Sequence, residues 1–304
     1  MNADDSTVRR HLDLLTLTEE PQVGDRLLLR SAEIMRRYAR MYCGGNESAP
    51  AGDCGRYHGW WQYWRLVGLA ATPDWHAGYY RDLLPSTSGA REFRVLICGT
   101  ADYGILEHLV RAIPPSLRRR TQIAVLDLCR TPLEICSWYS SEYLGGPDAE
   151  LRLSYHRSDA LRSPFRDEAF DLITSYSFLS RFPHDDKERV VREWCRNLKP
   201  GGRIVTSARL AASAMEEVEE LDAAEFSRQV VWQMLADKPW LQPVSDTIDR
   251  LAFDYAQTVV SHPLPSPDYL HELFGGFDSV VEIGTLDTRF EGSRNYAIVM
   301  ATKR

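Results

Sequence analysis

Short apolar runs alternate with stretches of helical periodicity through the middle of the chain. Strands are predicted over residues 93–98, 122–127, 151–155, 170–175 and 202–207. Helices are predicted between them, over 103–113, 132–142 and 185–197. Regular alternation of this kind predicts an α/β fold, with parallel strands joined by right-handed crossovers and helices on both faces of the sheet.

The chain after the fifth predicted strand carries more helix and then returns to strand. Two helical patterns, over 212–236 and 244–256, form a predicted insertion at residues 208–262. A helix over 267–274 and strands over 279–283 and 296–301 follow the insertion.

The first part of the chain, residues 1–88, is predicted to be a helical, aromatic-rich cap. Helical periodicity extends over 7–42, and a loop rich in Gly, Ser and Pro is predicted over 43–55. Residues 89–304, with the insertion, are predicted to form the core domain. The chain therefore divides into a cap and a core.

A dense aromatic segment stands at residues 57–64. Trp60, Trp61 and Trp64, together with two tyrosines, cannot all lie on one face of a helix, so some of them are predicted to line a substrate pocket. An apolar helix face packed on the core is the alternative. His58 is a candidate general base near the substrate, with a loop position as its alternative.

The first predicted core strand ends in a glycine turn. Apolar residues up to Cys98 are followed by Gly99, and a second glycine stands at Gly104. A buried parallel strand that turns sharply into a helix in this way leaves backbone open to a ligand. Asp127 ends the next strand, where a carboxylate can accept hydrogen bonds from two ribose hydroxyls, although a helix cap is the alternative.

Further along the chain stand Asp159-Ala160, the strand that ends near Tyr176, and a turn of Pro200, Gly201 and Gly202. With the glycine turn and Asp127, this series resembles the class I S-adenosylmethionine (SAM)-dependent methyltransferase family. The resemblance covers about residues 90–207 and resumes near the end of the chain, where the family closes its sheet with an antiparallel strand. It implies a Rossmann-like, seven-stranded, mostly parallel sheet and SAM as the cofactor.

Two positions depart from the family pattern. Ile97 and Cys98 stand where the family has an acidic residue before the first glycine, and Ala101 replaces its middle glycine. Asp102 is predicted to supply the missing carboxylate for the ammonium group of SAM. These departures are the reason to consider a reaction other than methyl transfer.

The resemblance also implies which residues contact the cofactor. Asp159 and Ala160 would lie beside the adenine, with a loop acid as the alternative for Asp159, and Leu128 would pack nearby. Tyr176 would face the sulfonium, where cation–π attraction is worth about 0.5 to 2 kcal/mol. The predicted cofactor contacts are Gly99, Thr100, Ala101, Asp102, Gly104, Asp127, Leu128, Asp159, Ala160, Ser175 and Tyr176.

Charge and composition limit the kinds of partner that the protein is expected to bind. The net charge of -7 argues against a dedicated nucleic-acid surface. No apolar run approaches the roughly 18 to 20 residues that span a bilayer, and the first residues contain no apolar signal segment, so no membrane partner and a cytoplasmic location are expected. A small-molecule substrate is expected, and the aromatic N-terminal helix could mediate a homodimer.

The six cysteines form no C-x-x-C pair. Cys98 and Cys129 stand at the ends of predicted strands, so buried reduced thiols are expected. A zinc site needs a tight group of ligands, and the spacing shows none. We therefore predict no metal.

Three functions remain open from the sequence. The first is in-line methyl transfer to a small biosynthetic metabolite, which needs alignment more than acid–base chemistry. The second is closure of SAM's own aminobutyrate chain to azetidine-2-carboxylate and methylthioadenosine. In that reaction Tyr176 would hold the sulfonium, and Ser207 would help to deprotonate the attacking amine. The third is a non-catalytic SAM-binding protein.

Overall fold

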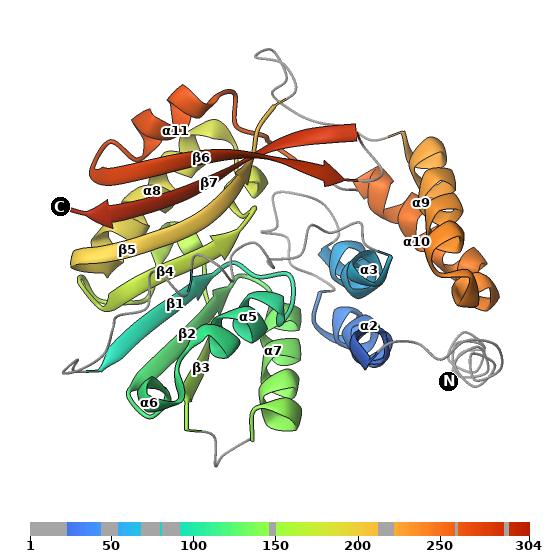
Figure 1. The fold of residues 1–304 in the computed structure, drawn as a ribbon, viewed down its shortest axis with the longest axis horizontal. Coiled ribbons are helices and arrows are strands. Elements are labelled where there is room, and N and C mark those ends of the chain that lie inside the picture. Colours follow the sequence, from blue (N-terminus) through green and yellow to red (C-terminus); the bar gives the residue numbers. More distant parts are fainter. Residues whose placement is uncertain are drawn as a thin grey trace. The chain divides into compact units, whose positions relative to one another are not determined.

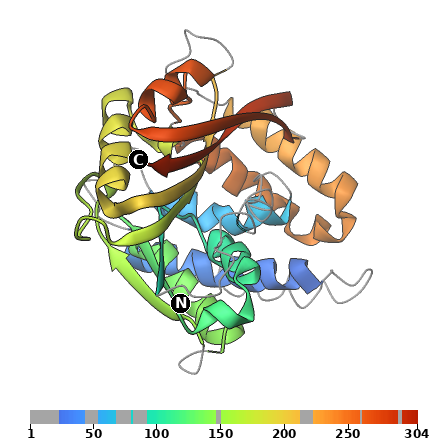
Figure 2. The same cartoon turned by 60° about the vertical axis from the view of Figure 1, so that its left-hand side comes forward.

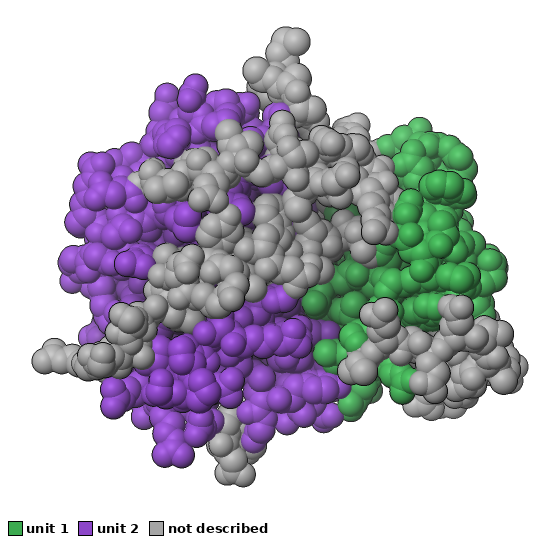
Figure 3. Space-filling model, in the orientation of Figure 1, with its two compact units in different colours: residues 1–71, 220–259, 288–292 green, residues 72–219, 260–287, 293–304 purple. Residues whose placement is uncertain are grey.

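A computed structural model describes residues 23–43, 54–67, 80, 92–145, 150–211, 222–258, 261–288 and 292–304. The chain divides into two compact units, which Figure 3 shows in different colours. Unit 1 contains residues 1–71, 220–259 and 288–292, and unit 2 contains residues 72–219, 260–287 and 293–304.

A seven-stranded sheet is the centre of unit 2, and its strand order is β3-β2-β1-β4-β5-β7-β6 (Figure 1). The strands are β1 Phe93–Cys98, β2 Thr121–Asp127, β3 Arg152–Arg157, β4 Phe170–Tyr176, β5 Leu198–Arg209, β6 Phe277–Thr288 and β7 Gly292–Lys303. Strands β1 to β5 pair in parallel, and β7 runs antiparallel to β5. The predicted α/β, mostly parallel sheet is confirmed.

The central strands are apolar because helices cover both faces of the sheet. β1, β2 and β4 are buried almost throughout, as strands of a parallel sheet are, whereas the edge strand β3 alternates between half-buried and exposed residues. One face of the sheet packs against α8 (His184–Asn197) through Trp194 and against the end of α11 (Pro267–Leu273) through Phe274, and both side chains lie with Leu96 and Ile173 in one apolar cluster.

The direction in which the chain moves across the sheet decides which face each connecting helix covers. From β1 to β3 it moves toward one edge, and from β4 to β5 toward the other, so right-handed crossovers place the connecting helices on opposite faces (Figures 1 and 2). Among the described residues of unit 2, the helices are α5 Gly104–Ala112, α6 Pro115–Arg118, α7 Arg130–Tyr143, η3 Ala160–Arg162, η4 Leu179–Arg181, α8 His184–Asn197 and α11 Pro267–Leu273.

The predicted turn at Pro200, Gly201 and Gly202 lies inside β5 rather than before it. β5 begins at Leu198, which pairs with Phe170, but the next paired residues are Leu172 and Arg203. The extra residues on β5 form an irregularity in the ladder, and Gly201 has a φ of +73° there. Strand pairing with β4 thus extends the strand beyond the predicted 202–207.

Unit 1 is helical and is built from two segments far apart in the chain. Its described helices are α2 Val23–Tyr42, α3 Cys54–Leu66, α9 Ala223–Asp237, η5 Pro239–Val244 and α10 Ser245–Thr258. Trp60, Val230 and Ile248 are fully buried in their common apolar core, and Lys238 donates to Asp25 at 2.5 Å. The sequence assigned the insertion to the core domain, whereas the structure groups residues 220–259 with the N-terminal helices.

Parts of the predicted N-terminal helix, loop and insertion lie outside the described residues, at 1–22, 44–53 and 212–221. The predicted loop over 43–55 ends early, because α3 begins at Cys54. Among the helices that are described, none combines the length and apolar character needed to cross a membrane.

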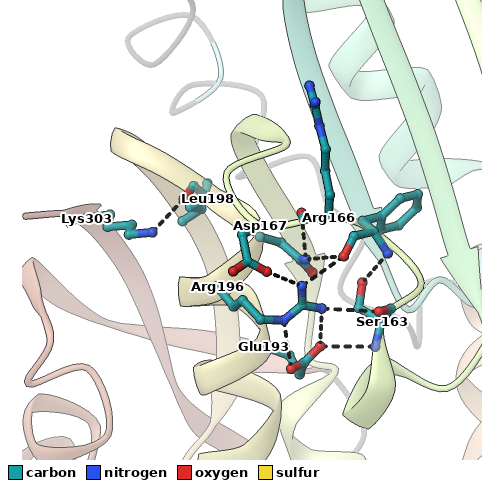
Figure 4. Close-up of polar contacts among 9 residues, drawn as sticks. Ser163, Arg166, Asp167, Glu193, Arg196, Leu198 and Lys303 are labelled. Atoms are coloured by element: carbon teal, nitrogen blue, oxygen red, sulfur yellow. Dashed lines mark hydrogen bonds and ion pairs between the residues drawn. The ribbon is translucent and has the colours of Figure 1, made fainter.

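In unit 2, Arg196 binds the turn before β4 to the end of α8 (Figure 4). Its guanidinium donates to both carboxylate oxygens of Glu193, at 2.7 and 3.1 Å, and to Asp167 at 2.7 Å. It also donates to the carbonyl oxygens of Phe165 at 2.9 Å and Ser163 at 3.2 Å. Five donors of one planar group thus hold a turn that has no regular secondary structure.

We expect Arg196→Ala to lower the free energy of unfolding by about 2 to 3 kcal/mol, because Glu193 and the turn carbonyls lose a charged donor. Arg192→Ala is the matched control on the same helix. Arg192 is 69% exposed and lies 3.7 Å from Glu188, so its loss should cost less than about 0.5 kcal/mol. Urea unfolding followed by circular dichroism measures both variants, and equal losses would contradict the structural role of Arg196.

Candidate functional site

The candidate site lies at the carboxyl ends of the parallel strands, where β1 and β4 are neighbours and the chain reverses its direction across the sheet. Ligands bind at this position in open α/β sheets, because the loops that leave β1 and β4 diverge there. Three segments of the chain reach this edge of the sheet: the glycine turn after β1, the end of β2, and the residues after β4.

Gly99 begins the turn with a φ of +71°, a conformation that favours glycine. A Cβ atom at this position would lie 2.1 Å from Cδ2 of Phe178, which follows β4. The aromatic ring therefore occupies the space beside the glycine. The sequence explained Gly99 by access for a ligand, and the contact with Phe178 is a second constraint that it did not predict.

Asp127, the last residue of β2, connects the glycine turn to α7. Its carboxylate accepts hydrogen bonds from the Thr100 N–H at 3.1 Å and from the Cys129 N–H at 2.7 Å. The half-buried carboxylate is thereby held at the carboxyl edge of the sheet. A carboxylate has about four acceptor positions, so two backbone hydrogen bonds are compatible with ribose binding.

The glycine turn is also fixed from α7. The Cys136 thiol donates to the carbonyl oxygen of Asp102 at 3.4 Å. The Tyr103 ring stacks on Tyr139, with ring centroids 4.4 Å apart and planes 1° from parallel. The backbone of the turn is therefore ordered by side chains of the protein itself.

Asp102 has a local role in this turn. It is 5% exposed, and its carboxylate accepts from the Gly104 N–H at 2.7 Å, at the start of α5. The Thr100 hydroxyl donates to the carbonyl oxygen of Asp102 at 2.5 Å. Its predicted contact with an ammonium group stays a prediction.

Asp159 and Ala160 follow β3 at the start of η3. The Asp159 carboxylate accepts from the Leu161 N–H at 2.9 Å and caps this short helix, while Ala160 is buried. Leu128, directly after Asp127, is 36% exposed. An exposed leucine beside the Asp127 carboxylate is consistent with the apolar contact predicted for adenine.

The end of β4 is held by β5. Tyr176 pairs with Ser207, and the Ser177 N–H donates to both the carbonyl and the hydroxyl oxygen of Ser207, each at 3.1 Å. Ser177 has a φ of +48°, and its own hydroxyl is buried without a hydrogen-bond partner among the described residues. The Ser175 hydroxyl bonds Thr206 at 2.6 Å inside the sheet. Ser175 and Ser207 therefore both have structural bonds.

Two residues near the end of β4 were not predicted. Phe178 lies two residues past Tyr176, the last residue predicted for the site at the end of this strand. Tyr80 comes from the segment before β1, is fully buried, and bonds the Thr174 hydroxyl at 2.7 Å; burial raises the pKa of its phenol well above the ordinary value. Its aromatic neighbours in the sequence were the available signal.

The cysteines of unit 2 near the turn are neutral thiols. Burial raises the pKa of Cys98 to about 12, and burial together with the Asp102 and Asp127 carboxylates raises the pKa of Cys136 well above its ordinary range. Neither thiol is a nucleophile at neutral pH. These two cysteines are packing residues.

The site residues predicted from the N-terminal segment belong to α3 in unit 1. Trp60 is fully buried, and the Trp64 ring lies edge-on to Tyr255 with centroids 4.0 Å apart. The indole N–H groups of Trp60, Trp61 and Trp64 are buried without a partner among the described residues. Their pocket role stays a prediction, as does a catalytic role for His58.

The expectation that no tight group of metal ligands exists is wrong. Cys43, Cys54 and His58 place their ligand atoms within 4.8 Å of one another in unit 1. Sequence spacing did not show this group, because Cys43 follows α2 whereas Cys54 and His58 lie on α3, and the packing of these two helices is not readable from the sequence.

Comparisons with known proteins agree with this geometry. A family model described as "Methyltransferase domain" matches residues 110–206. A demethylmenaquinone methyltransferase of Lactobacillus johnsonii is 26% identical over 140 residues, which are 46% of this chain and 51% of that protein. The methyltransferase GfsG of Streptomyces halstedii is 32% identical over 104 residues, 34% of this chain and 35% of that protein. The chain thus spans about half or less of the curated relatives it matches.

A solved structure shows the same fold. It is the phosphoethanolamine N-methyltransferase 2 of Haemonchus contortus in complex with phosphomonomethylethanolamine and S-adenosylhomocysteine. The TM-score is 0.51 at 14% identity, and the match covers 83% of this chain and 57% of that one. Residues 110–206 thus match the methyltransferase domain family, and the strand order and the solved structure show the class I, Rossmann-like fold of SAM-dependent methyltransferases.

Proposed function

We propose that this protein transfers the methyl group of SAM to a small-molecule acceptor. The observation that carries the proposal is the Asp127 carboxylate, bonded to the backbone of the glycine turn at the reversal point of the sheet. The residues present fit the cofactor in two further respects. Gly99 turns the chain in a left-handed conformation, and the buried Ser177 hydroxyl offers a polar group that a ligand would satisfy.

Each segment would hold a different part of the cofactor. Asp127 would accept from the ribose hydroxyls, Leu128 and Ala160 would contact the adenine, and the turn at Gly99 would lie along the amino-acid end. Bound SAM supplies an electrophilic methyl group on a positively charged sulfur. Tyr176 would direct its aromatic face toward that charge.

Methyl transfer asks little acid–base chemistry of the protein when the acceptor atom is electron-rich, so positioning and exclusion of water are its main contributions. The side chains of the site agree with this division, because Asp102, Ser175 and Ser207 each make a structural hydrogen bond. The ordered turn and the β4–β5 contacts would keep the cofactor in one orientation.

A small acceptor is the substrate class that we favour. The net charge of -7 is unsuited to a nucleic acid, and one relative is named for demethylmenaquinone, a small molecule. The three indole N–H groups of α3 are buried donors that a polar acceptor would satisfy. We infer from them that Trp60, Trp61 and Trp64 take part in acceptor binding.

Asp127→Ala should raise the dissociation constant of SAM at least about tenfold, or about 1.4 kcal/mol, because the ribose loses its acceptor and the turn loses its anchor. Asp127→Asn keeps one acceptor oxygen and should fall between the wild type and the alanine variant. Isothermal titration calorimetry measures all three proteins, with Asp167→Ala as the control at a carboxylate that is 74% exposed. Unchanged affinity in Asp127→Ala would refute the ribose assignment.

Product analysis decides which reaction occurs. The purified protein is incubated with SAM alone and with SAM plus a metabolite extract, and the products are identified by mass spectrometry. We expect S-adenosylhomocysteine only when the extract is present, because methyl transfer needs an acceptor. Methylthioadenosine with azetidine-2-carboxylate from SAM alone would establish the cyclase instead, and bound but unconsumed SAM in both reactions would indicate a binding protein.

A further inference from the structure

We propose that Cys43, Cys54 and His58 bind a zinc ion that joins the end of α2 to the start of α3. The three side chains lie in unit 1 and belong to none of the cofactor-binding segments. Their ligand atoms, two thiol sulfurs and an imidazole nitrogen, lie within 4.8 Å of one another. Thiolate and imidazole are the ligands that zinc prefers in proteins.

The local structure presents all three groups to one point. Cys43 directly follows α2, and its N–H donates to the Ala39 carbonyl oxygen at 3.0 Å, so the last turn of the helix fixes its backbone. Cys54 and His58 stand four residues apart on α3. Residues at this spacing lie on the same face of a helix, one turn apart, which is how two ligands of one helix reach a common metal.

The separations agree with a tetrahedral ion. Zinc lies about 2.3 Å from sulfur and about 2.0 to 2.1 Å from nitrogen, so ligand atoms around it are roughly 3.6 to 3.8 Å apart. The Cys43 sulfur lies 3.3 Å from Nδ1 of His58, and the three atoms stay within 4.8 Å.

Burial favours a bound ion over a solvated group of thiols. Cys43 is 4% exposed and His58 is 6% exposed, while Cys54 is partly exposed. Zinc binding would release the two thiol protons to solvent, and two thiolates would balance the two positive charges of the ion.

The other arrangement of these atoms is a hydrogen bond between Cys43 and His58 with Cys54 beside it. None of the six cysteines is in a disulfide bond. The Cys54 thiol donates to the Cys43 carbonyl oxygen at 3.9 Å, and its sulfur also lies within 4.8 Å of both other ligand atoms. Two thiols and an imidazole come together at one point, and this convergence supports a metal site.

The test uses the full chain, purified without added chelator under reducing conditions. Inductively coupled plasma mass spectrometry should find about one zinc per chain. After zinc removal, added Co²⁺ should give the thiolate-to-cobalt charge-transfer bands and the visible absorption of a tetrahedral site. Because loss of a supporting partner alone costs about 10- to 100-fold in metal affinity, Cys43→Ser, Cys54→Ser and His58→Asn should each weaken zinc binding at least about 100-fold.

Cys195→Ser is the matched control, since Cys195 is a partly exposed thiol on α8 in unit 2. It should bind zinc and cobalt like the wild type. The cobalt spectrum of the wild type needs no variant, so a variant that fails to fold does not remove the test. Absence of zinc together with a featureless cobalt spectrum would overturn the proposal, as would cobalt bands that survive in both Cys43→Ser and Cys54→Ser.

Discussion

The candidate site depends on one carboxylate at the end of a buried strand. Asp127 accepts from the backbone on both sides of it, at Thr100 in the glycine turn and at Cys129 before α7. The turn has no regular secondary structure of its own, so its conformation is set by such side chains. The group that orders the turn is also the group that we propose as the ribose acceptor, so the turn is ordered before any ligand binds.

Further contacts fix the segments that surround Asp127. Tyr103 stacked on Tyr139 ties the turn to α7, and Ser177 bonded to Ser207 ties the end of β4 to β5. Phe178 then packs directly against Gly99. The proposed methyl transfer would benefit from this construction, because an in-line displacement tolerates little displacement of the cofactor. The departures at Cys98 and Ala101 leave these supports intact, so they do not by themselves indicate another reaction.

Unit 1 shows how an insertion becomes part of a different unit. α9 and α10 follow the fifth strand in the chain, yet their apolar faces share a core with α2 and α3, and Lys238 pairs with Asp25 across more than two hundred residues of sequence. The aromatic residues of α3 are largely used in this core. Trp64 between Phe226 and Tyr255 is a packing contact first, and its unpartnered indole N–H is what remains for a ligand.

By itself the sequence determined the α/β core, the place of the glycine turn, and the carboxylates at Asp127 and Asp159. These features depend on local rules: strand and helix periods, the conformational freedom of Gly99, and the position of a residue just after a strand. Only the tertiary structure decided which helices share a core with α3, what fills the space beside Gly99, and that Cys43, Cys54 and His58 converge. Each of these features depends on contacts between residues of different elements. The periodicity of one helix or strand does not indicate which other element will pack against it.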